Sequence, residues 1–156
     1  MQRFLVYGLS HKTAPVSIRE ACAVPRSEQR ELLRALVASP AVEEALLLST
    51  CNRVEVYLVS SESSESAKVA VNEVLMTQRG LPVGTLDSHG YTMSGREATH
   101  HLMRVASSLD SMVVGEPQVL GQVKEAVVTA REAKTIGTLL GRIVERTLSV
   151  AKAVRT

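Results

Sequence analysis

The chain has 156 residues, of which 45% are hydrophobic and 22% charged, and its formal net charge is only +2. These values exclude an intrinsically disordered chain, which would have fewer apolar residues, and a protein dominated by a basic nucleic-acid-binding surface. Two cysteines do not make a disulfide framework, and no apolar run is long enough to cross a bilayer or to act as a secretory signal. We therefore expect a globular protein of the cytoplasm or of an organelle interior, with a core built from aliphatic side chains because only 3% of the residues are aromatic.

Strand and helix signals alternate through the first 60 residues. Ser17 and Glu20 stand at the spacing of a capping box, which predicts a helix that begins near Val16. Apolar runs bounded by polar and turn residues predict the strands. In chain order, the expected elements are a strand at 4–9, a loop at 11–15, a helix from about 16, a helix between Pro25 and Pro40, and strands at 45–48 and 54–59.

The rest of the chain becomes increasingly helical. Ser94 and Glu97 again stand at capping-box spacing, and an apolar face follows them. The expected elements are an exposed polar loop at 60–66, a helix at 67–79 closed by Gly80, a strand at 89–93, and helices from 94 onward that are interrupted at Gly115–Pro117 and at Gly137, the last of them running from about Thr138 to Thr156.

These signals predict an α+β fold. Residues 1–93 are expected to form a small mixed or antiparallel sheet with helices. Residues 94–156 are expected to form a helical subdomain that runs into a long connecting helix. No glycine-rich phosphate loop of the dinucleotide or P-loop type is found in the sequence.

Cys51 is the first candidate for chemistry. It lies between two expected strands, and Asn52 and Arg53 place an amide and a positive charge beside it. A nearby cation favours the thiolate, which is the nucleophilic form of cysteine. Cysteine is also among the most frequently buried residue types, but Ser-Thr-Cys-Asn-Arg is a polar sequence for a core position. Both interpretations stay open at this point.

A second cluster lies at 110–122. Glu116 and Gln118 fall at an expected helix N-terminus, where free backbone N–H groups bind anions or carbonyls. Gln118 and Gln122 are four residues apart and share one helix face, although a plain capped helix with solvent-facing glutamines explains them equally well. His101 borders an apolar stripe, where a lone histidine is more often structural than catalytic. No residue spacing resembles a zinc site.

Three long segments resemble the glutamyl-tRNA reductase family. They are Gly8–Pro15 (GLSHKTAP), Ser49–Tyr57 (STCNRVEVY), and the block formed by His101–Ala106 (HLMRVA) and Leu109–Ala126 (LDSMVVGEPQVLGQVKEA). Only residues 60–90 lack such a signal, and Val114 stands where the family often has Leu. Because the segments occur in the family's order, the resemblance is specific.

The resemblance implies an NADPH-dependent enzyme that makes glutamate-1-semialdehyde from glutamyl-tRNA, the first step of five-carbon tetrapyrrole synthesis. Cys51 would attack the glutamyl ester to give a thioester, and His101 would assist. Arg53 would bind the substrate's side-chain carboxylate, and Glu116 could hold its α-ammonium group. The full set of implied substrate-binding residues is Thr50, Asn52, Arg53, Ser111, Glu116, Pro117, Gln118 and Gln122.

The resemblance also implies parts that this chain does not include. We expect residues 1–156 to be the N-terminal catalytic domain with the start of the connecting helix, and the NADPH-binding and dimerisation domains to be absent, so that this fragment alone cannot complete the reduction. The full-length enzyme would be a homodimer, with glutamate-1-semialdehyde aminomutase as a further partner and no metal. The alternatives are a non-catalytic tRNA-binding module and a redox-sensing interaction module.

Overall fold

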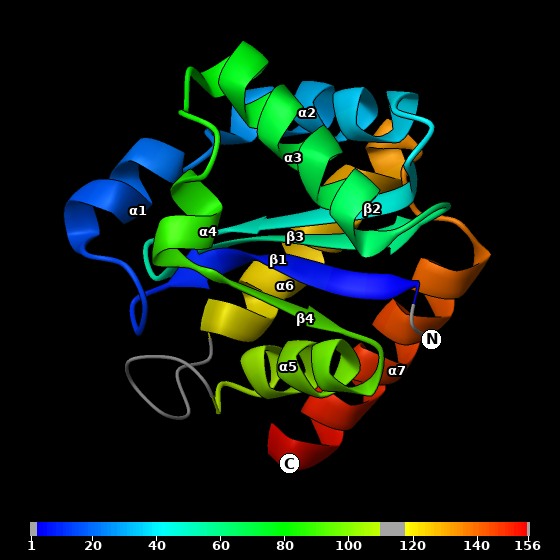
Figure 1. The fold of residues 1–156 in the computed structure, drawn as a ribbon. Coiled ribbons are helices and arrows are strands. Elements are labelled where there is room, and N and C mark those ends of the chain that lie inside the picture. The colour runs from blue at the N-terminus through cyan, green and yellow to red at the C-terminus, as the bar shows by residue number, and fades with distance from the viewer. Residues whose placement is uncertain (1–2, 110–117, 156) are drawn as a thin grey trace.

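The computed structural model describes residues 3–109 and 118–155, and within them the chain forms four strands and seven helices (Figure 1). The elements are β1 (Phe4–Ser10), α1 (Val16–Cys22), α2 (Arg26–Ala38), β2 (Val42–Ser49), β3 (Arg53–Ser60), α3 (Ser64–Arg79), α4 (Thr85–His89), β4 (Tyr91–Ser94), α5 (Arg96–Ala106), α6 (Gln118–Ala133) and α7 (Thr138–Arg155). None of these described helices is long and apolar enough to cross a membrane.

The strands form one antiparallel sheet in the order β2-β3-β1-β4. The α+β prediction is therefore confirmed, and the sheet is antiparallel rather than mixed. Every residue of β1 is buried, because β1 lies between β3 and β4 and is covered on both faces. Burial on both faces explains why the sequence of β1 is a continuous apolar run instead of an alternating pattern.

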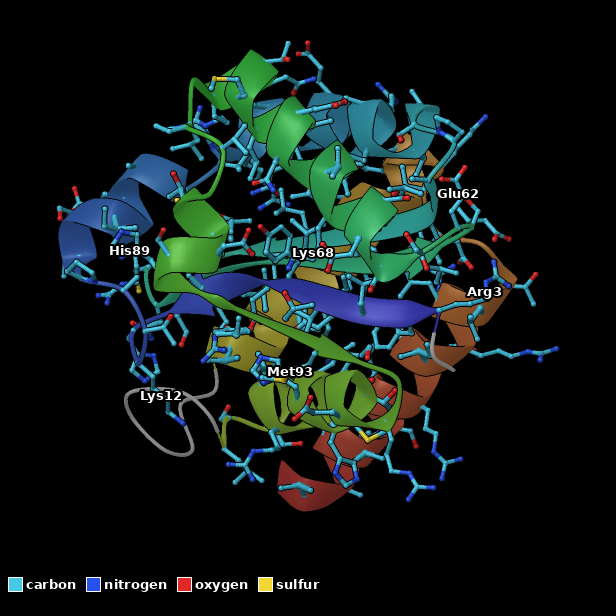
Figure 2. All side chains as sticks on the ribbon, in the orientation of Figure 1. Arg3, Lys12, Glu62, Lys68, His89 and Met93 are labelled. Carbon is cyan, nitrogen blue, oxygen red and sulfur yellow. The ribbon has the colours of Figure 1, made fainter. Side chains whose placement is uncertain are left out.

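Helices cover both faces of the sheet. Figure 1 shows α2 and α3 on one face and α5 and α7 on the other, while α6 runs past the edge strand β2, where it contacts α2. Figure 2 shows Lys68 extending from α3 toward the sheet, where its Nζ lies 5.0 Å from the centre of the Tyr7 ring. One continuous set of buried apolar side chains includes residues from the sheet and from both helical layers. The C-terminal helices thus share their core with the sheet.

Both predicted capping boxes are wrong, although the helices begin close to the expected residues. Pro15 occupies the N-cap of α1, and no side chain caps that helix. Ser94 is the last residue of β4 and pairs with Leu5, so the N-cap of α5 falls on Gly95, whose φ of 59° makes the sharp turn from strand to helix. Pairing within the sheet therefore takes the serine that the local pattern assigned to the cap.

Two other boundaries differ from the prediction. The expected loop at 60–66 is shorter, because Ser60 belongs to β3 and the Ser63 hydroxyl caps α3 by accepting the Ser66 amide at 3.1 Å. His89 ends the short helix α4 instead of beginning a strand. The predicted strand is real but starts at Tyr91.

The free edge of β2 is tied to the segment between α6 and α7. Ala45 and Thr135 exchange backbone and side-chain hydrogen bonds of 2.9 and 2.8 Å. Glu44, which is only 5% exposed, accepts the backbone amides of Gly137 and Leu140 at the start of α7. A carboxylate from the sheet therefore satisfies the first N–H groups of the helix, which have no partner within it.

Candidate active site around Cys51

The turn between β2 and β3 is shaped by Thr50. The amide of Thr50 donates to the carbonyl of Arg53 at 2.8 Å, which closes the turn. The Thr50 hydroxyl accepts the amides of Asn52 and Arg53 at 3.1 and 3.2 Å. Because these bonds use backbone groups on both sides of Cys51, they fix the turn and leave Cys51 exposed at its tip.

Two neighbouring segments hold the same turn from outside. Arg19 of α1 donates from Nε to the carbonyl oxygen of Cys51 at 3.2 Å. The amide of His11, which follows β1, donates to the carbonyl oxygen of Asn52 at 2.8 Å. Both contacts are made to backbone oxygens, so the turn is anchored without covering the thiol.

A cavity of about 510 Å³ opens beside Cys51. It brings together residues from α1, the α1–α2 link, the turn, α3 and α6, and its lining is Glu20, Ala23, Val24, Pro25, Ser49, Thr50, Cys51, Arg79 and Gln122. A second cavity of about 230 Å³, between α2, β2 and α6, shares Val24, Ser49 and Gln122 with the first. The structure therefore joins Thr50, Cys51 and Gln122, three residues singled out from the sequence.

Arg53 directly follows the turn, as the first residue of β3. It is 2% exposed and is not among the residues that line the cavity beside Cys51. Its Nη1 lies 3.4 Å from Oε2 of Glu55, with which it forms a buried ion pair. Its guanidinium thus already interacts with a protein carboxylate.

Glu55 is the centre of a buried polar network that the sequence reasoning missed. Its side chain is fully buried and accepts hydrogen bonds from the hydroxyl groups of Tyr57, at 2.6 Å, and Tyr91, and it also contacts Nε2 of His101. The sequence does contain a signal for it. Arg53, Glu55 and Tyr57 alternate along a strand and so share one face, where buried charge requires partners.

The network fixes the protonation of its members. Burial acts to raise the pKa of Glu55, but the hydrogen bond from His101, the charge of Arg53 and the hydrogen bond from the Tyr57 hydroxyl together hold that pKa below its usual value. Burial and the Glu55 charge raise the pKa of Tyr57 and of Tyr91. At neutral pH, Glu55 is therefore an ionised acceptor and both tyrosines are donors.

His101 lies on the buried side of α5 and is 8% exposed, which confirms that it borders the apolar face. It does not line the cavity beside Cys51, and its connection to the turn runs through Glu55 and Arg53. Of the remaining predicted site residues, Ser111, Glu116 and Pro117 lie outside the described residues. Gln118 is the first described residue of α6, and the carbonyl of the half-buried Asn52 accepts the backbone amide of His11.

Fold and site together define an α+β domain that presents one exposed cysteine beside a cavity and contains a buried carboxylate–histidine network. The family model described as the N-terminal domain of glutamyl-tRNAGlu reductase matches residues 7–156. The chain belongs to this family.

Curated relatives and a solved structure agree with that assignment. Glutamyl-tRNA reductases from Syntrophotalea carbinolica and Geobacter metallireducens are each 47% identical to the chain over 97% of its length, and the chain covers 34% and 35% of them. The structure of glutamyl-tRNA reductase from Methanopyrus kandleri covers 99% of the chain with a TM-score of 0.77 and 30% identity, and the match spans 35% of that protein. The chain thus spans about a third of the length of these relatives.

Proposed function

We propose that this domain captures the glutamyl group of glutamyl-tRNA as a thioester on Cys51. The observation that carries the proposal is the exposed thiol at the tip of a rigid turn, beside a cavity lined by Thr50 and Gln122. Membership of the glutamyl-tRNA reductase family supports the choice of substrate. The alternatives, a tRNA-binding module and a redox-sensing module, leave this exposed thiol without a role or give it one without acyl transfer.

The proposed step is an acyl transfer. The Cys51 thiolate attacks the ester carbonyl carbon of the glutamyl group, and a carbon–sulfur bond forms. The bond from that carbon to the terminal ribose oxygen breaks, the oxygen takes up a proton, and the tRNA leaves with a free hydroxyl group. The thioester accepts a hydride more readily than the ester it replaces, which gives the covalent step its purpose.

The remaining site residues have proposed supporting roles. Thr50 holds the turn through its hydroxyl, and the Gln122 amide offers a hydrogen bond to substrate within the cavity. Asn52, Arg53, Ser111, Glu116, Pro117 and Gln118 stay proposals as glutamyl-binding residues. His101 is proposed to assist the acyl transfer.

The reduction is assigned to no residue of this chain. The described strands are all antiparallel, whereas the dinucleotide-binding fold needs parallel strands and a glycine-rich turn at a helix N-terminus. These residues therefore do not fit NADPH, and we derive no hydride step. A homodimer, an aminomutase partner and a cytoplasmic location are likewise proposals for the full-length enzyme.

Single-turnover labelling tests the acyl transfer. The chain is incubated with tRNA that carries labelled glutamate and is then quenched in acid. We expect acid-stable label that neutral hydroxylamine releases and that Cys51→Ser abolishes. Cys22→Ser is the matched control, because Cys22 is only 1% exposed and burial raises the pKa of its thiol, so label should remain.

Other outcomes would contradict the proposal. Binding of glutamyl-tRNA without any adduct, unchanged by Cys51→Ser, would favour a tRNA-binding module. A change of oligomeric state on alkylation of Cys51, again without adduct, would favour an interaction module that senses redox state.

A further inference from the structure

Three donors converge on one oxygen of Glu55. Oε2 contacts Nε2 of His101, the hydroxyl of Tyr91 and, at 3.4 Å, Nη1 of Arg53. The other oxygen, Oε1, accepts only the Tyr57 hydroxyl among the described side chains, at 2.6 Å. The two carboxylate oxygens therefore bind different partners, and only Oε2 contacts the histidine.

Gly8 makes this arrangement possible. It lies on β1, one of the two inner strands, and is the register partner of Glu55 on β3 and of Tyr91 on β4. Because Gly8 has no side chain, Tyr91 reaches across β1 to the carboxylate. A Cβ at this position would lie 3.0 Å from Cγ of Glu55 and closer still to the backbone of β3.

Tyr91 also contacts the imidazole directly. Its ring packs edge-on against His101, with the ring centres 5.5 Å apart and the ring planes at 62°. Tyr91 therefore restrains the histidine ring by packing against it. Through its hydroxyl group, Tyr91 also restrains Glu55, the carboxylate that the histidine ring contacts. Residues of β3 and β4 together hold a side chain that comes from α5.

These contacts determine which ring nitrogen carries the proton. An ionised carboxylate can only accept, so Nε2 of His101 must be the donor. In the neutral imidazole the lone pair is then on Nδ1. We propose that Glu55 and Tyr91 are positioning residues that hold His101 in one orientation and in the Nε2–H tautomer. Their effect on acyl capture rests on the proposed function.

The test compares two tyrosine variants that each remove one hydroxyl group from Glu55. Tyr91→Phe removes it from the oxygen shared with His101, while Tyr57→Phe removes it from the other oxygen. Both variants keep the ring and both leave a buried carboxylate with one bond fewer, so loss of stability alone affects them alike. The readouts are the ¹⁵N shifts of the His101 ring without substrate and the single-turnover rate of thioester formation.

We expect the wild-type ring nitrogens to show a fixed Nε2–H tautomer and Tyr91→Phe to move both toward the tautomeric average. Acyl capture should slow about tenfold or more, part of the full contribution of a general acid or base. The affinity for glutamyl-tRNA should stay within about twofold, since positioning acts on the rate. Tyr57→Phe should leave the tautomer and the rate close to wild type.

The two hypotheses fail in different ways. Averaged ring shifts in the wild type, or a folded Tyr91→Phe with unchanged shifts and rate, would overturn the positioning role. Equal slowing by Tyr57→Phe would overturn it too, because the effect would then follow from any loss at Glu55. A fixed tautomer in a wild-type chain that forms no thioester would refute the proposed function while the tautomer assignment stands.

Discussion

Replacing Gly8 by alanine should disrupt the close approach between β1 and β3. A Cβ built on Gly8 lies 2.3 Å from the carbonyl oxygen of Val54 and 2.7 Å from Cα of Glu55. The nearer contact falls about 1.1 Å short of the 3.4 Å at which ordinary contact begins. Both atoms belong to the backbone of β3, so no side-chain rotation relieves the clash.

The magnitude follows from what must move. Separating β1 from β3 by about 1 Å stretches hydrogen bonds of about 2.9 Å beyond useful length. Overpacking costs about 1–3 kcal/mol, and each lost backbone hydrogen bond adds about 1 kcal/mol. We therefore expect Gly8→Ala to lower the free energy of unfolding by about 3 kcal/mol.

Urea unfolding followed by circular dichroism measures this loss. Gly121→Ala is the matched control, since Gly121 is exposed on α6 and nothing lies within 4 Å of an added Cβ. The same substitution there should raise the free energy of unfolding by about 0.5–1 kcal/mol, because it removes glycine from a helix interior. Equal midpoints for Gly8→Ala and wild type would refute the register between β1 and β3.

Three further predictions concern buried polar groups. Glu44→Ala leaves two amides at the start of α7 without an acceptor and should lower the free energy of unfolding in urea by about 2–3 kcal/mol. The control Glu43→Ala removes only a half-exposed ion pair with Arg3 and should lower it by under about 1 kcal/mol. At pH 10.5 an ordinary tyrosine is about three-quarters ionised. Burial raises the pKa of all three tyrosines of the chain, which are Tyr57, Tyr91 and Tyr7, the last to about 12. The native chain should therefore show little tyrosinate absorbance at this pH until it is unfolded with denaturant. Because the pKa of Glu55 is lowered in the folded state, its ionised carboxylate stabilises the fold above the unfolded-state pKa of 4.5, and this stabilisation is lost as the pH falls through the folded-state pKa. Across that window the free energy of unfolding, measured in urea, should therefore fall less steeply with pH in Glu55→Gln than in wild type. Equal pH profiles of the two proteins would contradict the network.

Local sequence patterns predicted the elements well and their connections less well. The apolar runs of β1 and β3 and the periodic faces of the helices were identified because burial alone determines them. The caps at Ser17 and Ser94 were wrong because a cap also depends on where a neighbouring strand ends, as the pairing of Ser94 with Leu5 shows.

The candidate site divides in the same way. Cys51 and its polar neighbours could be proposed from the sequence because their residues are adjacent in it. Tyr91 was missed because its role depends on Glu55, 36 residues away, and on an intervening glycine that provides room. Such cross-strand relations become visible only once the order β2-β3-β1-β4 is known.

The strand order also determines when each strand can pair during translation. β1 emerges from the ribosome first, yet both of its partners, β3 at 53–60 and β4 at 91–94, are made later. At bacterial and eukaryotic elongation rates, roughly 4–17 s separate the completion of β1 from that of β4. Until β3 is complete, about 2.5–10 s after β1, the apolar segment FLVYGL has no strand to pair with and is a target for chaperones or for aggregation. Thus β1, an inner strand of the finished sheet, stays without a pairing partner longer than any other described strand.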